Sequence, residues 1–335
     1  MASSMPTVGD AVKALRAWLP ARRGAALYVS VLASALIVPA FLDGYSIFLA
    51  NLALAYVPIA IGLTIILGWT GQFAFTSAAF FGFGAYTGAL LGATFNLPVE
   101  LAIGIGVASC LVLGGALAAL TIRLSGYYLS IVTIAFTYFL QFVYENLPAV
   151  TRGVAGFAVP APYLALLGGR TLGSDYERYY VGLALAVVGF AFASWLRTTR
   201  LGRAWQALRQ SEASAAALGI DVRRAKVAAQ AIGAACFGAA GVWFAYLNGQ
   251  VYPQSFDLHE LIFHFLIVVV GGLGSLRGGA IAAVVLVVAA EFFRELTGLA
   301  EIGFGLALLL SVLFFRGGLY GTLVRQWPRL REPFA

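Results

Sequence analysis

Two histidines and a glutamate, His259, Glu260 and His264, are the residues that come closest to a metal-binding motif. A zinc hydrolase motif of this kind places its two histidines one helical turn apart, so that both imidazoles face one ion. Here the second histidine follows the first by five positions, which turns it by about 140° around a helix. One metal ion could not bind both, so we expect polar helix positions and no metal site.

The chain also lacks the residues that nucleotide or covalent chemistry needs. A phosphate-binding loop ends in Gly-Lys-Ser/Thr, but the only lysines are Lys13 and Lys226, and neither follows a glycine. Cys110 and Cys236 both lie in apolar runs, which favours buried reduced thiols over a disulfide. No nucleophile is paired with a base. We therefore expect no enzyme activity and no cofactor bound by this chain, which argues against a polytopic membrane enzyme.

The elements that carry these residues are membrane-spanning helices. Of 335 residues, 61% are hydrophobic and 10% are charged, more apolar than a soluble core of this size requires. The apolar runs do not alternate in polarity, so they predict helices and not barrel strands. The expected fold is an all-α, polytopic transmembrane helical bundle of about ten helices. The predicted spans are 25–42, 46–67, 74–92, 99–120, 126–146, 179–196, 226–247, 259–274, 280–296 and 301–315.

The basic residues predict the orientation. An even number of spans with a basic N-terminus inside puts both termini in the cytoplasm, and 17 of the 21 basic residues then lie inside. The four outside are Arg152, Arg170, Arg178 and Arg294. This topology explains the net charge of +7 better than a nucleic-acid partner does. The predicted regions are a cytoplasmic interfacial helix (1–24), a transmembrane domain (25–315) with an external loop (147–178) and a cytoplasmic loop (197–224), and a cytoplasmic tail (316–335).

Gly84, Gly88 and Gly92 stand four positions apart, so they share one face of a helix. Such a face lets another helix approach closely, either within the bundle or at a dimer interface. The same span, 74–92, is rich in glycine, and we expect that it either crosses the membrane or re-enters as a broken helix.

The cytoplasmic loop has the pattern of two short helices. Ala204, Ala207 and Leu208 form one face of the first, Ser211 is a candidate N-cap for the second, and Gly219 is a candidate left-handed C-terminal residue. The second helix consists mostly of small residues and has low relief. Two interpretations remain open: a solvated connecting loop, or a helix that inserts into a groove of another protein.

The same loop, RTTRLGRAWQALRQSEASAAALGIDVRRAK, resembles the coupling loop of the branched-chain amino acid ABC transporter permease family, in its LivM-type membrane subunit. Four further stretches resemble that family in the same order: GWTGQFAFTSAAFFGFGAYTGALL (68–91), RLSGYYLSIVTIAF (123–136), YPQSFDLHELIFHFLIVVVGGLGSLRGG (252–279) and FFRGGLYG (314–321). The resemblance extends from residue 68 to residue 321, which is most of the chain.

The resemblance implies a permease subunit of an ATP-driven importer in the bacterial inner membrane. Its implied partners are a second, homologous permease, two cytoplasmic ATPases that hold ATP and Mg²⁺, and an extracytoplasmic solute-binding protein. The ATPases are expected to move the loop as a lever that switches access across the membrane. The residues implied in coupling are Arg209, Ser211, Glu212, Ala213, Ala216, Ala217, Leu218, Gly219 and Ile220.

The chain departs from the family pattern at several polar positions. Ser77 stands where the family usually has His, the external segment TRGVAG (151–156) lacks an acid, and Leu261 and Phe263 replace Ser and Glu. The expected solutes are therefore branched-chain amino acids or related small amides and carboxylates, including aromatic acids. The candidate polar residues of the pore or its mouth are Gln72, Ser77, Tyr86, Asn248, Gln250 and His264.

A stand-alone secondary transporter or channel is the alternative. Such proteins place ionisable groups in the middle of the membrane for ion coupling. Here the centres of the spans are nearly free of such groups, with His264 as the main exception. The ATPase-coupled subunit is therefore the favoured interpretation.

Overall fold

The computed structural model describes residues 32–124, 126–295, 306, 318, 320 and 321, without the side chains of 167 and 292–295. The predicted interfacial helix (1–24), all of the span 301–315 except residue 306, and most of the tail (316–335) lie outside the described residues. The chain divides into two compact units, 1–47 and 48–335.

In the first unit a short apolar helix covers Leu32–Phe41, and its last turn, Val38–Phe41 (η1), is a 3-10 helix. Asp43 then accepts a hydrogen bond at Oδ1 from the Ser46 backbone N–H at 3.2 Å, at the start of helix α2 (Gly44–Leu63). Hydrogen bonds from the side chain and backbone of Ser46 lower the pKa of the Asp43 carboxyl. This turn is the predicted break between the spans 25–42 and 46–67.

Six described helices are long and apolar enough to cross a membrane. The first is α2, which continues as a π-helix, Thr64–Trp69 (η2). The others are α3 (Ser77–Phe95), α4 (Val99–Thr121), α5 (Tyr127–Asn146), α7 (Asp175–Thr198) and α10 (Val222–Asn248). Two further apolar helices, α11 (Leu258–Gly271) and α12 (Leu276–Glu295), pack against each other. The helical membrane fold predicted from the sequence is therefore confirmed.

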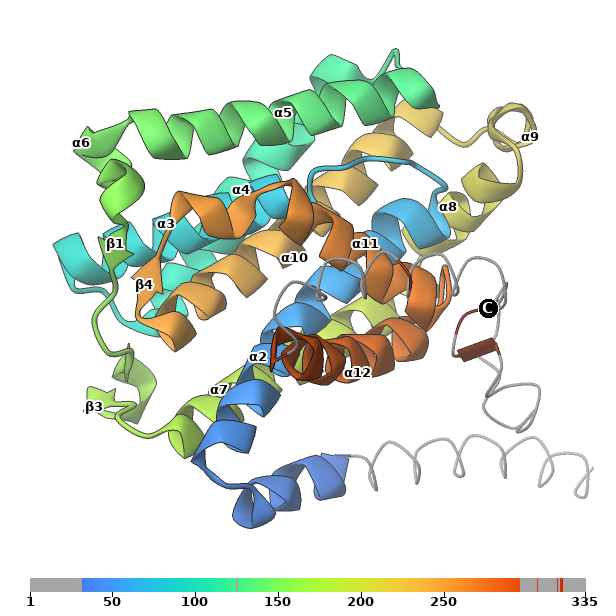
Figure 1. The fold of residues 1–335 in the computed structure, drawn as a ribbon. Helices are drawn as coiled ribbons and strands as arrows, with labels where there is room; N and C mark the ends of the chain where they lie inside the picture. Colours follow the sequence, from blue (N-terminus) through green and yellow to red (C-terminus); the bar gives the residue numbers. More distant parts are fainter. Residues whose placement is uncertain (1–31, 125, 296–305, 307–317, 319, 322–335) are drawn as a thin grey trace, which may run out of the picture. The chain divides into compact units, whose positions relative to one another are not determined.

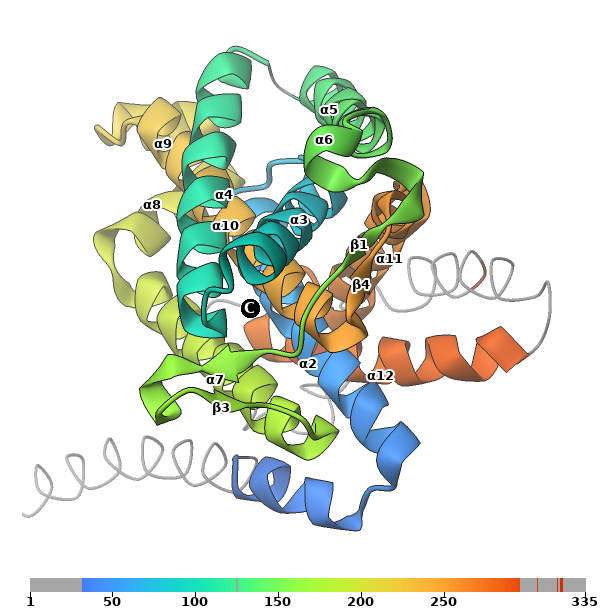
Figure 2. The ribbon, with the colours of Figure 1, turned by 90° about the vertical axis from the view of Figure 1, so that its left-hand side faces the viewer.

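The long connection after α5 is built from short elements. They are α6 (Pro148–Thr151), η3 (Gly153–Ala155), β1 (Phe157–Ala158), β2 (Tyr163–Leu164), η4 (Ala165–Leu167) and β3 (Arg170–Thr171). Strand β1 pairs antiparallel with β4 (Gln250–Val251), which follows α10, and Phe157 lies opposite Val251. Strand β2 pairs with β3. The connection is thus fastened to the end of α10, before η5 (Pro253–Phe256) leads into α11 (Figure 2).

Helix α10 forms the centre of the second unit and packs along α3 and α4 (Figures 1 and 2). Small residues permit the close approach. A Cβ added to Gly84 would lie 2.3 Å from the carbonyl oxygen of Gly238, and Gly88 and Gly92 similarly face Val242 and Tyr246. The three glycines therefore serve contacts between α3 and α10 of the same chain, which is the first of the two interpretations that their spacing allows.

Two helices differ from the predicted spans, α3 in its bounds and α11 in its length. The glycine-rich span 74–92 is one continuous helix of 19 residues, Ser77–Phe95. The predicted span 259–274 is instead a helix of 14 residues, because the chain turns at Gly271–Ser275. At 1.5 Å per residue such a helix extends only about 21 Å, short of the roughly 30 Å of a bilayer core.

Candidate functional site

The predicted coupling loop consists of two short helices between α7 and α10, namely α8 (Arg200–Gln210) and α9 (Glu212–Ala217). Thr199 caps the start of α8, and the Ser211 hydroxyl accepts from the Ser214 N–H at 3.2 Å at the start of α9. Gly219 has a φ of +81°, so the chain leaves α9 in the left-handed conformation that glycine favours. The Asp221 carboxylate then accepts from the Arg224 N–H and caps α10. Both local features predicted for α9 are present.

Helix α9 presents an exposed surface of small side chains. Glu212, Ala213, Ala216 and Ala217 are exposed, and Leu218 at its end is 78% exposed. Only Ala215 of this helix is buried. Figure 1 shows α9 at the periphery of the second unit, beyond the ends of α8 and α10. The exposed surface of α9 therefore consists mostly of short side chains, several of them apolar.

Helix α8 is anchored by a buried face, and α9 is anchored to α10 by an ion pair. The buried face of α8 consists of Gly202, Trp205 and Leu208. Glu212 of α9 pairs with Lys226 of α10, with the Nζ and Oε1 atoms 2.6 Å apart. Of the three residues predicted to share one face of this helix, Leu208 is buried and Ala204 and Ala207 are partly buried, whereas the buried Trp205 was not predicted. The signal in the sequence for this buried residue was a single tryptophan in an otherwise basic and polar loop.

The remaining residues assigned to the loop do not form one surface. Arg209 is exposed at the end of α8, and its guanidinium group reaches Gly274 in the turn between α11 and α12. Ile220 is partly buried and packs against the hydrophobic core. The two residues flank α9 and face different neighbours.

A cluster of polar side chains joins α2 and α11. The Tyr56 hydroxyl donates to Oε1 of Glu260 at 2.6 Å, and Nε2 of His264 lies 3.1 Å from the same oxygen. His264 is fully buried, its ring contacts Tyr56 and Phe81, and its Nδ1 has no hydrogen-bond partner among the described residues. Glu260 and Tyr56 were not among the predicted site residues.

His259 is exposed while His264 is buried, as the angle between them on a helix requires. Within the described residues there is no group of three His, Cys, Asp or Glu that could hold a metal ion. This segment contributes a hydrogen-bonded carboxylate, that of Glu260.

Replacing Tyr56 tests whether this cluster stabilises the fold. Tyr56→Phe removes the hydroxyl that donates to Glu260, whose side chain is only 17% exposed. We expect the free energy of unfolding to fall by about 1–3 kcal/mol, because a partly buried carboxylate loses a partner. Chemical unfolding in detergent micelles measures it, with Tyr138→Phe as the control, since Tyr138 is 51% exposed. Equal stability of the two variants would show that the hydrogen bond contributes nothing.

The chain matches a known protein family over most of its length. The family model for the permease component of the branched-chain amino acid transport system matches residues 45–315. The chain belongs to this family. It is therefore a multi-pass membrane permease subunit, as the sequence resemblance implied. No solved structure matches it.

Two kinds of curated relative resemble this permease. The high-affinity branched-chain amino acid permease protein LivM of Escherichia coli K12 is 32% identical over 320 residues, which cover 87% of this chain and 73% of LivM. The Salmonella typhimurium LivM is 31% identical, over 90% of this chain and 77% of the relative. The Salmonella typhimurium LivH is 26% identical, over 71% of this chain and 82% of LivH. The permease thus resembles both membrane subunits named in these systems.

Five of the six polar pore candidates occupy two kinds of place in this permease. Ser77, Tyr86 and His264 are buried inside the chain. Asn248 and Gln250 are exposed at the end of α10, where Asn248 donates to the Phe244 carbonyl and Gln250 accepts from the Tyr252 hydroxyl. Their place in a pore stays a prediction.

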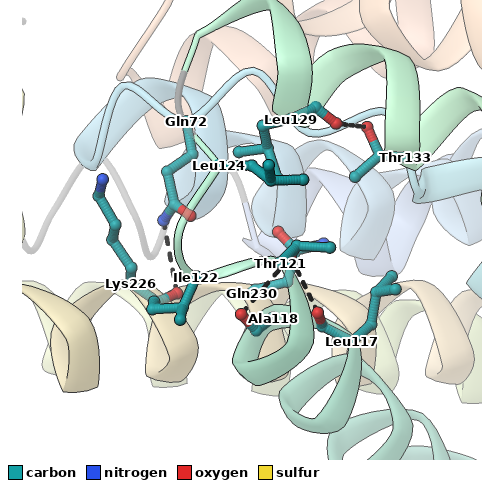
Figure 3. Close-up of a pocket in the computed structure, with 10 residues that line it drawn as sticks. All are labelled: Gln72, Leu117, Ala118, Thr121, Ile122, Leu124, Leu129, Thr133, Lys226 and Gln230. Atoms are coloured by element: carbon teal, nitrogen blue, oxygen red, sulfur yellow. Dashed lines mark hydrogen bonds between the residues drawn. The ribbon is translucent and has the colours of Figure 1, made fainter.

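Gln72, the sixth candidate, lines a small pocket between α4, α5 and α10 (Figure 3). Its amide donates to the Thr70 hydroxyl at 2.9 Å and to the Lys226 carbonyl at 3.4 Å. Nearby, the buried Gln230 donates to Thr76. These bonds tie the segment between η2 and α3 to the first turns of α10, close to α8 and α9. Gln72 therefore holds the segment before α3 against the start of α10, next to the predicted coupling loop.

Proposed function

We propose that this chain forms one half of the translocation path of an ATP-driven importer for branched-chain amino acids or related small amides and carboxylates. The observation that carries the proposal is α9, a capped helix with an exposed, low-relief surface between two membrane-spanning helices. The family and the named relatives support the permease role and the solute class. The second half of the path is a homologous permease, which the likeness to both LivM and LivH supports.

In this proposal two cytoplasmic ATPases bind α9 and carry ATP and Mg²⁺. The chain has no phosphate-binding loop of its own, because neither Lys13 nor Lys226 follows a glycine. The exposed residues Ala213, Ala216, Ala217 and Leu218 enter a groove of the ATPase, and Glu212 and Arg209 border the contact. A rigid-body closure of the ATPases then displaces α9 and changes access to the path.

The proposed orientation puts α8 and α9 in the cytoplasm of a bacterial cell and the loop 147–178 outside the inner membrane. The excess of Arg in the α8 region supports it, because cytoplasmic loops are enriched in basic residues. The external side presents the pairs β1–β4 and β2–β3, and an extracytoplasmic solute-binding protein docks there. Both termini are cytoplasmic.

Transport by the reconstituted complex tests this function. The chain is co-expressed with its candidate ATPases, second permease and binding protein, purified, and reconstituted in proteoliposomes. We expect uptake of radiolabelled L-leucine that requires ATP and the binding protein and that vanadate abolishes. Competition with unlabelled isoleucine, benzoate and urea then ranks the solute classes. Uptake by the purified chain alone, without ATP, would show a stand-alone transporter instead.

A further inference from the structure

Two buried tryptophans lie where the cytoplasmic loop meets the membrane-spanning helices. Trp205 is the fully buried centre of α8, and Trp69 is the last residue of the π-helical end of α2 and is 2% exposed. Their ring centroids are 6.2 Å apart, with 31° between the ring planes. The contact joins α8 directly to a membrane-spanning helix.

Each indole N–H extends the contact to another element. The Trp205 Nε1 donates to the carbonyl of Ala225, in the first turn of α10, at 2.8 Å. The Trp69 Nε1 donates to the carbonyl of Gly274, in the turn between α11 and α12, at 3.1 Å. The pair therefore links α8 to α2, α10 and the α11–α12 turn at once.

The α11–α12 turn is held closely between η2 and α8. A Cβ added to Gly68 would lie 2.7 Å from the Cα and N of Gly274, so the two backbones touch. On the other side, a Cβ at Gly274 would lie 2.7 Å from Nη1 of Arg209. Because packed protein interiors have low compressibility, a displacement of η2 passes directly to the turn, whereas Arg209 connects α8 to the turn through a flexible side chain.

The helix that ends in Trp69 is irregular at this point. Residues Thr64–Trp69 form a π-helix, and the Thr64 and Thr70 hydroxyls donate to the carbonyls of Ala60 and Ile66. A π-helical turn departs from the regular ladder and occurs often at functional sites. The end of α2 that receives the tryptophan contact is thus the part of that span whose hydrogen bonding already deviates from the α pattern.

We propose that Trp69 and Trp205 form the joint through which a displacement of α8 and α9 reaches α2 and the α11–α12 turn. The proposal rests on the function proposed above, in which an ATPase binds α9. Another link on this side, the pair Glu212 and Lys226, joins α9 to α10, and Glu212 is 54% exposed. An ion pair with one exposed partner resists displacement weakly. The tryptophans are positioning residues that touch neither solute nor nucleotide.

The test follows the movement itself, in a form that needs no knowledge of the solute. Leu273 is 46% exposed in the α11–α12 turn, so Leu273→Cys provides a site for a maleimide label. Labelling rates are compared between the nucleotide-free complex and the complex trapped with ATP and vanadate. The complex without Leu273→Cys gives the blank for Cys110 and Cys236. We expect trapping to change the rate about fivefold or more, the usual size of a coupling between sites.

Trp205→Phe, Trp69→Phe and the double variant are then placed in this background. Phenylalanine keeps an apolar ring but removes the indole N–H, so the fold should survive. We expect all three to retain the ATPases and ATP hydrolysis, while the change in labelling and the leucine uptake per ATP fall about fivefold or more. The double variant should lose little beyond the larger single loss, because the two residues act as one joint. Trp195→Phe is the control, since Trp195 is 60% exposed on α7.

Three results would overturn the proposal. If labelling in the tryptophan variants responds to trapping as in wild type, the joint lies elsewhere. If ATPase binding, hydrolysis and labelling fall in parallel with the melting temperature, the tryptophans only stabilise the loop. If the wild-type complex never retains an ATPase, the proposed function fails, and the joint fails with it. Only this last result is measured on the wild-type complex, so failure of the proposed function is distinguishable from failure of the joint alone.

Discussion

A complex that carries Ala216→Asp and Ala217→Asp should purify without its ATPase subunits. Both alanines are exposed on α9, and no side chain of the described residues covers them. An interface on this surface would bury two carboxylates with no cationic partner supplied by the chain. We expect association to weaken by at least about 100-fold, because burying unpaired charge costs several kcal/mol. Pull-down from detergent with quantitative mass spectrometry measures the ratio of ATPase to permease.

A second pair of substitutions separates docking from helix fraying. Asp near a helix C-terminus is unfavourable on its own, whereas Lys is favourable there, because of the helix dipole. Ala216→Lys with Ala217→Lys therefore keeps α9 helical but still blocks a close contact. Ala161→Asp, at an exposed site of the 147–178 loop, is the control for adding a carboxylate to the surface away from α9. Loss of the ATPase subunits from both α9 variants, with their retention in the Ala161→Asp complex, supports docking on α9. Wild-type ratios of ATPase to permease in all three complexes would refute it.

The local features of the fold followed from the sequence, because their causes are local. Apolar runs identified the membrane-spanning helices, and Ser211 and Gly219 marked the two ends of α9. Hydropathy predicted the wrong end for the span 259–274, because a glycine turn interrupts the apolar run. Gly272 and Gly274 have φ values of +107° and +96°, so they form a turn that favours glycine, and α11 ends before the predicted limit of the span 259–274. The Gly-Gly-Leu-Gly sequence was the turn signal that the apolar run concealed.

The contacts that build the site could not be predicted in this way. Trp69 meets Gly274 across 205 positions of sequence, and Tyr56 meets Glu260 across 204. Periodicity describes which face of a helix is apolar, but not which helix that face will meet. Trp205 has a similar explanation, since a tryptophan in a basic loop is equally compatible with a membrane interface and with burial. Pairings of this kind depend on the packing of the whole unit.

The stability of the second unit should depend strongly on Gly241. This residue lies on α10, where an added Cβ would be 1.9 Å from the carbonyl oxygen of Phe81 and 2.8 Å from the backbone N of Ala85. Both atoms belong to the backbone of α3, which cannot rotate away as a flexible side chain can. Gly241→Val should therefore force α3 and α10 apart. Because overpacking of a core usually costs about 1–3 kcal/mol, and here the obstacle is a helix backbone, we expect a loss at or above the upper limit.

Gly104→Val makes the same chemical change without the clash. Gly104 lies on an exposed face of α4, and a Cβ there meets nothing within 4 Å. Because valine exceeds glycine in helix propensity by only a few tenths of a kcal/mol, the control isolates the helix contact. Thermal unfolding in detergent, with size-exclusion profiles as a measure of aggregation, should show a large fall in melting temperature for Gly241→Val alone. Equal melting temperatures would mean that α3 and α10 are not in backbone contact at Gly241, and the close packing that positions the spans around α10 would have to be abandoned.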